Sequence, residues 1–227
     1  MKISNILLTG LFGSITFTTL AMMVDIVFGI GSPDYTQYDQ KTIPLPAFRY
    51  LQLSNAARSV AIEASDTASI KLFTMSGNPM PSLDYHLEGD TLIVDQVGNH
   101  DVIGAYFKLQ VPGNVLQGVT AQNVQIVLND YPFRRMSLVL NNARVQFYPK
   151  VRRNLGMLSV TGVNESHINV SSSIDTLSLQ LEKSSIVVDD AIQLVQGRIT
   201  NSSTLSVRAV GVFDFSKDAS SHFDHWN

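Results

Sequence analysis

Beyond residue 47, hydrophobic and polar residues alternate along most of the chain. Ser69–Phe73 and Ala105–Val111 are two of several such short runs, and Gly, Pro, Asn or Ser residues bound most of them. Strict alternation over a few residues is typical of a strand with one buried face. Leu83–Leu87 and Thr91–Val94 flank a turn that contains Gly89, which predicts a β-hairpin. Because no amphipathic helical pattern follows, the sequence predicts an all-β domain.

The second half of this region repeats a phrase in which a small or polar residue precedes two alternating apolar residues. The small residue recurs at positions 122 (a Gln), 143, 166, 184 and 203, in steps of 21, 23, 18 and 19 residues. Self-similarity near 20 residues, with two short strands in each copy, indicates a β-solenoid in which each copy forms one turn. A β-sandwich also contains short strands, but it would not keep one phrase at one period.

The repeat also predicts which side chains point into the solenoid. Because alternate residues of a strand face the same side, two apolar ladders should cross the stacked turns, with the small residues at a crowded corner. The first ladder is Val145, Ile168, Ile186 and Leu205, and the second is Phe147, Val170, Val188 and Val207. His167, next to Ile168, should point outward.

The N-terminal segment has a different pattern. Ile6 to Val24 contains no charged residue, and its 19 residues approach the roughly 20 that a helix needs to cross a bilayer. Lys2 precedes the run and Asp25 follows it, which favours an N-terminus on the inside and the bulk of the chain outside. We therefore expect residues 1–30 to form an N-terminal membrane anchor with one transmembrane helix.

A cleaved signal sequence is the alternative for residues 1–30. The uncharged run is longer than the apolar core of a signal peptide, and no A-x-A-like cleavage site stands at its end. Gly10, Ser14 and Thr18 recur every four residues, a spacing of small residues that lets a second membrane helix pack closely.

Two further segments flank the predicted solenoid domain, which we place at residues 47–215. Residues 31–46 are rich in Pro and polar residues and predict a linker. Residues 208–215 should add a closing strand to the stack. Residues 216–227 form a C-terminal tail that either folds over the open end or docks on a partner.

Composition excludes several classes of protein. Charged residues make up 15% of the chain, and the formal net charge of −3 argues against a nucleic-acid partner. Cysteine is absent, which excludes disulfides and thiol chemistry. No phosphate-binding loop, dinucleotide fingerprint, nucleophile elbow or repeating row of carboxylates is present. The sequence therefore predicts no catalytic residue, metal or cofactor.

A cluster of basic residues is the strongest candidate for a ligand or partner surface. No acidic residue occurs between Tyr131 and Glu165, and the cluster comprises Arg134, Arg135, Lys150, Arg152 and Arg153, with Arg144 between the two arginine pairs. The pairs precede successive turns and should lie one above the other. Such an edge suits a phosphorylated glycan, a lipid headgroup or an acidic partner. Charged loops that only keep a solenoid soluble are the alternative.

Two weaker signals concern modification and metal binding. Thr67, Thr91 and Thr176 each stand in an Asp-Thr-apolar pattern that serves as an O-glycosylation acceptor in some bacterial envelopes. A turn Asp followed by the first residue of a strand gives the same pattern. His222 and His225 lie in a polar tail, which more often stays solvated than binds a metal.

Between about Phe48 and Phe213, the sequence resembles the GIN domain, a proposed adhesin head domain of bacterial envelope proteins. The resemblance rests on the hairpin strand Glu88–Val94, the strand Lys108–Pro112 that ends in Val-Pro, and the coils that follow. The turns differ, because Asn, Glu, Lys and Ser stand where the family often has Gly. The resemblance implies a right-handed parallel β-helix in the cell envelope, and it carries no catalytic residues.

These observations predict a noncatalytic, membrane-anchored envelope scaffold or interaction module with an extracytoplasmic β-helical domain. A glycan-binding or adhesive head is the alternative, supported by the stacked Asn and Ser turns, and a β-helical envelope hydrolase or lyase has the least support. The expected partners are the lipid bilayer, an envelope protein or a second copy of the chain, and a glycan. The expected location is the bacterial inner membrane, with a single pass and the bulk of the chain in the periplasm.

Overall fold

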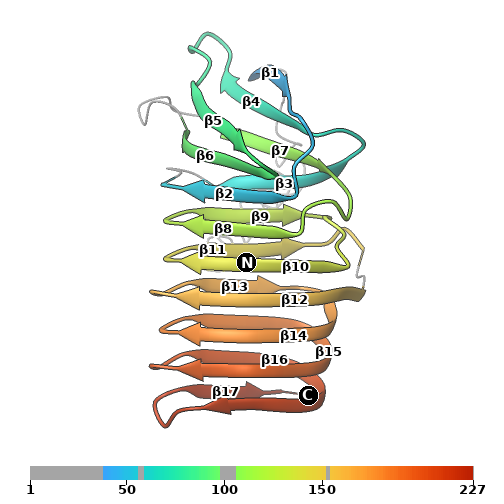
Figure 1. The fold of residues 1–227 in the computed structure, drawn as a ribbon, viewed down its shortest axis with the longest axis vertical. Coiled ribbons are helices and arrows are strands. Elements are labelled where there is room, and N and C mark those ends of the chain that lie inside the picture. Colours follow the sequence, from blue (N-terminus) through green and yellow to red (C-terminus); the bar gives the residue numbers. More distant parts are fainter. Residues whose placement is uncertain (1–37, 56–58, 98–105, 152–153, 227) are drawn as a thin grey trace, which may run out of the picture. The chain divides into compact units, whose positions relative to one another are not determined.

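The computed structural model describes residues 38–55, 59–97, 106–151 and 154–226. Asp39–Asn227 form one structural unit, and all regular elements in its described part are β-strands. From β8 onward the strands wind into a β-solenoid of about six turns, as the repeat predicts (Figure 1). Among the described residues, no helix has the length and apolarity to span a membrane. The predicted anchor, with Gly10, Ser14 and Thr18, lies outside the described residues.

Two stacks of strands form the walls of the solenoid. The front sheet, nearest the viewer in Figure 1, contains in spatial order β5 (Leu83–Glu88), β6 (Thr91–Val97), β2 (Tyr50–Ser54), β8 (Gly118–Gln122), β10 (Arg135–Asn141), β12 (Asn154–Val163), β14 (Ser173–Glu182) and the second halves of β15 (Ser185–Thr200) and β16 (Thr204–Lys217). The back sheet contains β1 (Tyr38–Pro44), β4 (Ser69–Met75), β7 (Tyr106–Pro112), β3 (Val60–Ser65), β9 (Gln125–Asn129), β11 (Arg144–Tyr148), β13 (His167–Val170), the first halves of β15 and β16, and β17 (His222–His225).

The chain passes between the sheets at two edges. At the turn edge, on the left of Figure 1, short turns lead from the front sheet to the back sheet. At the loop edge, on the opposite side, the chain returns to the front sheet. Within β15 this return is continuous, with a register shift between Val188 and Ala191.

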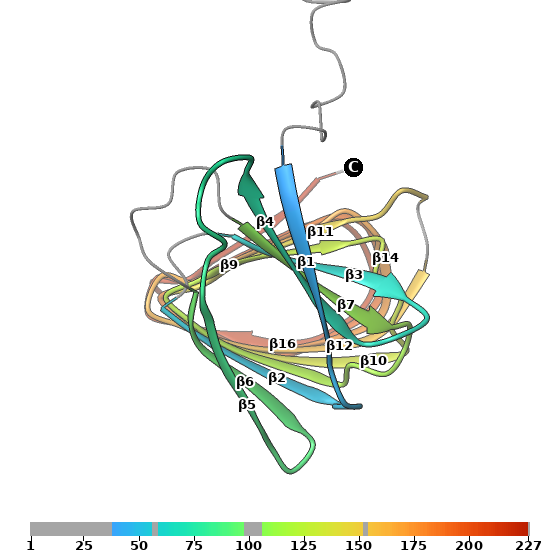
Figure 2. The same ribbon diagram turned by 90° about the horizontal axis from the view of Figure 1, so that it is seen from above.

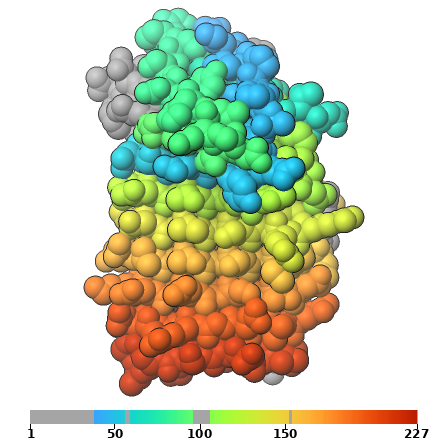
Figure 3. All heavy atoms as spheres, viewed as in Figure 1, coloured from blue at the N-terminus to red at the C-terminus, as the bar shows by residue number. Residues whose placement is uncertain are grey.

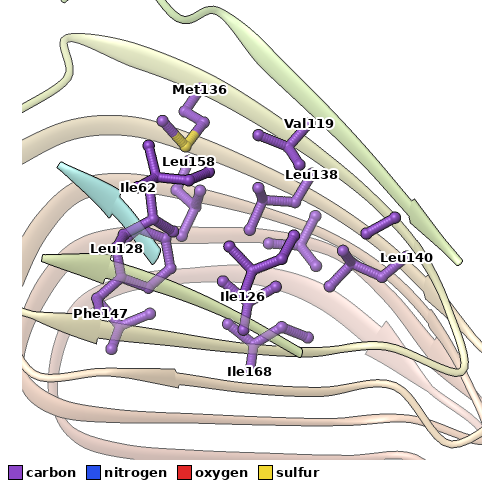
Figure 4. Packing of buried hydrophobic residues seen from close by; sticks show 14 of the residues in the cluster. Ile62, Val119, Ile126, Leu128, Met136, Leu138, Leu140, Phe147, Leu158 and Ile168 are labelled. Atoms are coloured by element: carbon purple, nitrogen blue, oxygen red, sulfur yellow. The ribbon is translucent and has the colours of Figure 1, made fainter. Parts of the chain in front are cut away.

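Both predicted apolar ladders are confirmed. Each member pairs with the next in parallel register, and all are buried: Val145, Ile168, Ile186 and Leu205 in the first ladder, and Phe147, Val170, Val188 and Val207 in the second. Side chains of the front sheet, such as Leu138 and Leu158, pack against these ladders from the opposite wall (Figure 4). Burial of this apolar surface is the main source of stability in such a fold.

A buried serine ladder occupies the turn edge. The hydroxyls of Ser166, Ser184, Ser203 and Ser221 accept hydrogen bonds from the backbone N–H of the corner residue one turn earlier, at 3.2–3.3 Å. Ser166 also donates its hydroxyl proton to the Val163 carbonyl at 2.7 Å. The serine side chain fits the limited volume of these corners, and its hydroxyl satisfies an N–H that would otherwise be buried without a partner.

The corner residue of the first copy is Val124. The sequence prediction of Gln122 for this corner is wrong. Arg144 N donates to the Val124 carbonyl, just as His167 N donates to the Ala143 carbonyl one turn later. Val124 therefore fills the corner, with 5% of its surface exposed. Gln122 lies two residues earlier, opposite Asn141. A search for small residues at the corner overlooks this position because valine is larger than serine or alanine.

Left-handed backbone conformations explain how these turns form without glycine. At least one residue with positive φ stands in each of these turns: Asn55, Asn123, Asn142, Asn164 with Glu165, Lys183, and Asn201 with Ser202. Asparagine tolerates this region better than most residues because its short polar side chain forms local hydrogen bonds. The asparagine side chains also join neighbouring turns, since the Asn142 amide donates a hydrogen bond to the Asn123 side chain at 2.9 Å.

Strands extend beyond the predicted domain on both sides. Residues 38–44 of the predicted linker form β1, which pairs with β4. Five of the seven β1 residues are exposed, which explains why no alternating pattern marks this strand. At the other end, residues 208–215 extend the stack as predicted, within β16. Residues 222–225 of the predicted tail form β17, which pairs with the start of β16.

Candidate binding grooves

Outward side chains of the front sheet form rows, because successive strands pair in parallel without slipping. One row contains Ser137, Ser159, Ser178, Gln196 and Asp214, and the neighbouring row contains Val139, Thr161, Gln180, Arg198 and Ser216. Figure 3 shows this face, on which side chains of successive turns lie one below another. Most members of both rows carry a hydroxyl or an amide group, so this face is polar but carries little charge.

The lower part of these rows encloses a groove of about 460 Å³, which we name the front groove. Its polar lining residues are Ser159, Thr161, Ser178, Gln180, Gln196 and Asp214. The Gln196 amide donates a hydrogen bond to the Ser178 hydroxyl at 2.8 Å. Gly197 also lines the groove with φ of 124°, and a Cβ there would lie 2.0 Å from the Leu179 carbonyl oxygen. No side chain can therefore project from this position.

An apolar row runs beside the front groove. This outward row contains Met157, Thr176, Leu194 and Val212. Each lies two residues before a member of the serine-containing row, on the side of the loop edge. Val212 is 57% exposed, and the other members are half-buried. Hydroxyl and amide groups beside an apolar strip suit a ligand with many hydroxyls and apolar C–H faces, because binding sites combine a few placed polar groups with apolar contact surface.

A second groove lies at the turn edge, and we name it the turn groove. Its volume is about 340 Å³, and its side chains come from several turns: Arg144, Glu165, His167, Lys183, Ser185, Ser202 and Thr204. Arg144, His167, Ser185 and Thr204 form one outward row of the back sheet. The predicted outward orientation of His167 agrees with this position.

His167 is the central side chain of the turn groove. Its Nδ1 lies 2.6 Å from the Ser185 hydroxyl. Partial burial, and then the positive charge of Arg144, lower the pKa of the His167 imidazole below its usual value. His167 is therefore neutral at neutral pH, when the groove holds the positive charges of Arg144 and Lys183 and the negative charge of Glu165.

The predicted basic cluster is only partly described. Arg134, Arg135 and Lys150 are exposed near the loop edge, whereas Arg152 and Arg153 lie outside the described residues. The predicted vertical stacking is wrong for Arg135, because its partner in the next turn is Met157. The step from residue 143 to residue 166 is the longest in the repeat, at 23 residues, so equal spacing of the two arginine pairs does not give equal register. Whether the cluster binds a ligand stays a prediction.

The other predicted sites are scattered. Thr67 is exposed in the connection between β3 and β4, whereas Thr91 and Thr176 are half-buried within strands. Their glycosylation stays a prediction. In β17, His222 Nε2 lies 2.9 Å from Asp224 Oδ1. In the part of the chain that the structure describes, no three His, Asp or Glu side chains come together to hold a metal.

Sequence reasoning missed both grooves. Their residues are the polar positions between the ladder residues, so the alternation places them outside the core. Which of them meet across turns depends on the residue-by-residue register, and the unequal steps of the repeat conceal that register in the sequence.

The fold is similar to those of solved bacterial structures. A proposed adhesin from Bacteroides fragilis gives a TM-score of 0.56 at 8% identity, covering 83% of this chain and 96% of its own. A proposed adhesin from Parabacteroides distasonis gives a TM-score of 0.50 at 11% identity, with the same coverages. At such identities the likeness shows the fold alone. No family model and no curated protein matches the sequence, so membership of the GIN family stays a prediction.

Proposed function

We propose that this chain is a noncatalytic, adhesin-like binding module whose front groove contacts the hydroxyl groups of a glycan. The observation that carries the proposal is the alignment of hydroxyl and amide side chains from three successive turns along one groove. Each of these groups can donate and accept hydrogen bonds, as sugar hydroxyls do. The adjacent apolar row supplies contact surface for the C–H faces of sugar rings.

The composition of the front groove also supports a noncatalytic role. Glycoside hydrolysis uses a pair of carboxyl groups on either side of the scissile bond. Among the described residues, Asp214 is the only ionisable side chain that lines the groove. Hydrogen bonds to a solvated ligand contribute little net free energy each, because they replace hydrogen bonds to water. A single groove therefore binds weakly, and adhesion gains strength when many copies act together on one surface.

An envelope location fits this role. The uncharged run Ile6–Val24 supports an N-terminal anchor in the bacterial inner membrane, with the β domain on the periplasmic side. Mass spectrometry of the purified protein tests this part of the proposal. A mature N-terminus between residues 25 and 35 would show that the segment is a cleaved signal instead.

Glycan binding is tested by blocking the front groove. The Ser178→Trp variant places a large side chain in its centre, and we expect an affinity loss of about tenfold or more for a glycan identified on an array. Ser206→Trp is the matched control, because Ser206 is a half-buried outward serine of the back sheet, between Val187 and Asp224. Equal binding by the two variants would refute the role of the front groove.

A scaffold that binds an envelope protein is the second candidate. The exposed apolar residues Val212, Phe213 and Trp226 near the C-terminal end favour it, since aromatic side chains are enriched at protein interfaces. Purification of the full chain from detergent should then recover a stoichiometric partner. The Phe213→Ser variant should lose that partner, whereas Ser178→Trp should retain it.

A further inference from the structure

We propose that the turn groove is a second ligand site, which binds an oxyanion substituent, a sulfate or a carboxylate, of an acidic glycan. The site is separate from the front groove: it lies at the turn edge and shares none of the front groove's lining residues. The proposal extends the glycan-binding role but does not depend on the front groove, so the two sites can fail independently.

Two unpaired cations provide the attraction. Arg144 begins β11, and Lys183 lies in the turn between β14 and β15. Both are exposed, and neither has a salt-bridge partner among the described residues. An unpaired guanidinium or ammonium group can form charge-assisted hydrogen bonds with an anionic oxygen, which are about twice as strong as neutral ones.

Hydroxyl groups complete the lining. Ser185 and Thr204 lie next to each other in the outward row below His167, and Ser202 comes from the following turn. Each can donate a proton to an anionic oxygen or to a sugar hydroxyl. The groove volume of about 340 Å³ lies within the range of small-molecule sites, which allows a sugar ring to enter together with its charged substituent.

His167 makes this site sensitive to pH. The charged groups around the imidazole are Arg144 on β11, and Glu165 and Lys183 in the adjacent turns. Partial burial, and then the charge of Arg144, hold the His167 pKa low, so the imidazole is neutral at pH 7.5. A bound anion next to the ring offsets the positive charge of Arg144 and attracts the imidazolium, which favours the protonated imidazole. Anion affinity should therefore rise as the pH falls, because the complex takes up a proton that the free protein lacks.

Calorimetry on the full chain tests the site with three probes: dextran sulfate, polygalacturonate and neutral dextran. The two acidic polymers should bind, more tightly at pH 5.5 than at pH 7.5 and more weakly as salt is added. Lys183→Asn should reduce their affinity about tenfold, the loss of one charge-assisted hydrogen bond. Asparagine is chosen because residue 183 has φ of 50°. Glu165→Gln should increase the affinity.

Two control variants distinguish a specific site from general charge attraction. Arg198→Gln removes an exposed cation from the front sheet and should leave the binding of acidic polymers unchanged. His167→Gln should remove the rise in affinity between pH 7.5 and 5.5 while the protein stays folded. Equal losses in Lys183→Asn and Arg198→Gln would indicate nonspecific attraction and overturn the proposal, as would an equal loss of neutral dextran binding in Lys183→Asn. Ser178→Trp should weaken contacts through sugar hydroxyls for all three polymers alike, and it should leave the pH dependence of acidic-polymer binding unchanged.

Discussion

The two ends of the stack of turns are closed in different ways. Any solenoid ends in strands with unpaired backbone groups and in an open apolar interior, and both promote association with other chains. At the N-terminal end, antiparallel strands cover both walls: β5 pairs with β6, and β4 pairs with β7. Seen from above, β1 and β4 cross over the stack (Figure 2). Ile70 of β4 is fully buried there.

The C-terminal end has no such cover among the described residues. Parallel strands β16 and β17 end the two sheets, and their inward side chains form an aromatic cluster. The Phe223 ring meets those of Phe213 and Phe215 edge-on, at centroid distances of 5.0 and 5.3 Å. Phe213 nevertheless remains 44% exposed. In the described part of the chain, additional antiparallel strands close the N-terminal end, whereas side chains of the last strands close the C-terminal end.

A lysine supplements the aromatic cluster. Lys217 continues an inward row beneath Ile199, and its Nζ donates to the Ser221 carbonyl at 3.2 Å. An inward-pointing charge at the edge of a sheet opposes the addition of another strand, because that strand would bury it. Among the described residues, the last turn differs from those before it by its aromatic side chains and this inward lysine.

Removing the C-terminal closure should have the largest effect. A chain that ends at Val207 lacks the second half of β16 and all of β17, so core residues such as Val195 and Ile199 would become exposed. We expect a lower melting temperature by circular dichroism and self-association by light scattering. A chain that ends at Lys217 should show a smaller change. A monomeric truncated protein with the full-length melting temperature would show that the closure is dispensable.

Single substitutions compare the two closures directly. Ile70→Ala at the N-terminal end should cost about 2–5 kcal/mol, the range for truncating a fully buried aliphatic side chain. Phe213→Ala at the C-terminal end should cost about 1–2 kcal/mol, because much of this ring already contacts solvent. Chemical denaturation of both variants measures the difference. Equal costs would mean that the aromatic cluster stabilises its end as strongly as the antiparallel strands do.

The role of Lys217 predicts a change in association rather than in folding. Lys217→Leu should promote dimers or larger species in analytical ultracentrifugation, with little change in melting temperature. Lys71→Leu is the matched control, because Lys71 lies on β4, which pairs with β1. If both variants associate equally, the added apolar surface alone is responsible and edge protection by Lys217 is refuted.

The smallest predicted effect concerns Asp218, which follows β16. Hydrogen bonds from the Ser221 hydroxyl, the Asn201 backbone N–H and the Ser220 hydroxyl hold the pKa of Asp218 at about 2. A depressed carboxyl pKa contributes stability above its ordinary value of 3.8, and this contribution is lost as the pH falls through about 2. Asp218→Asn should therefore speed hydrogen exchange at Asn201 and Ser221 at pH 5 but not near pH 1. Equal hydrogen exchange rates in Asp218→Asn and the unmodified protein at pH 5 would contradict this prediction.

The apolar ladders could be predicted from the sequence, and the closure of the N-terminal end could not. Ile168 and Ile186 occupy equivalent places in a repeated phrase, so local alternation fixes their inward direction. By contrast, β2 lies between β6 and β8. Some forty residues separate β2 from β6 in sequence, and more separate it from β8. A period of two is the same for parallel and antiparallel strands, and it carries no information about such distant neighbours.

The same limit applies to the grooves. His167 and Arg144 could be placed on the outer surface because each precedes an inward ladder residue. Their meeting with Ser185 and Lys183 depends on the exact length of each turn, which varies along the chain. The polar character of the sites could thus be predicted, but not their composition.

The stacking of the turns also determines how the domain should respond to mechanical force. Each turn is joined to the next by the interstrand hydrogen bonds of both sheets and by one serine hydrogen bond at the corner. A pull on the C-terminal residues along the stack axis would load one turn after another and peel the turns away at low force. A pull along the strands would shear many interstrand hydrogen bonds at once. The direction of tension, more than the number of bonds, would then set the force at which the domain yields.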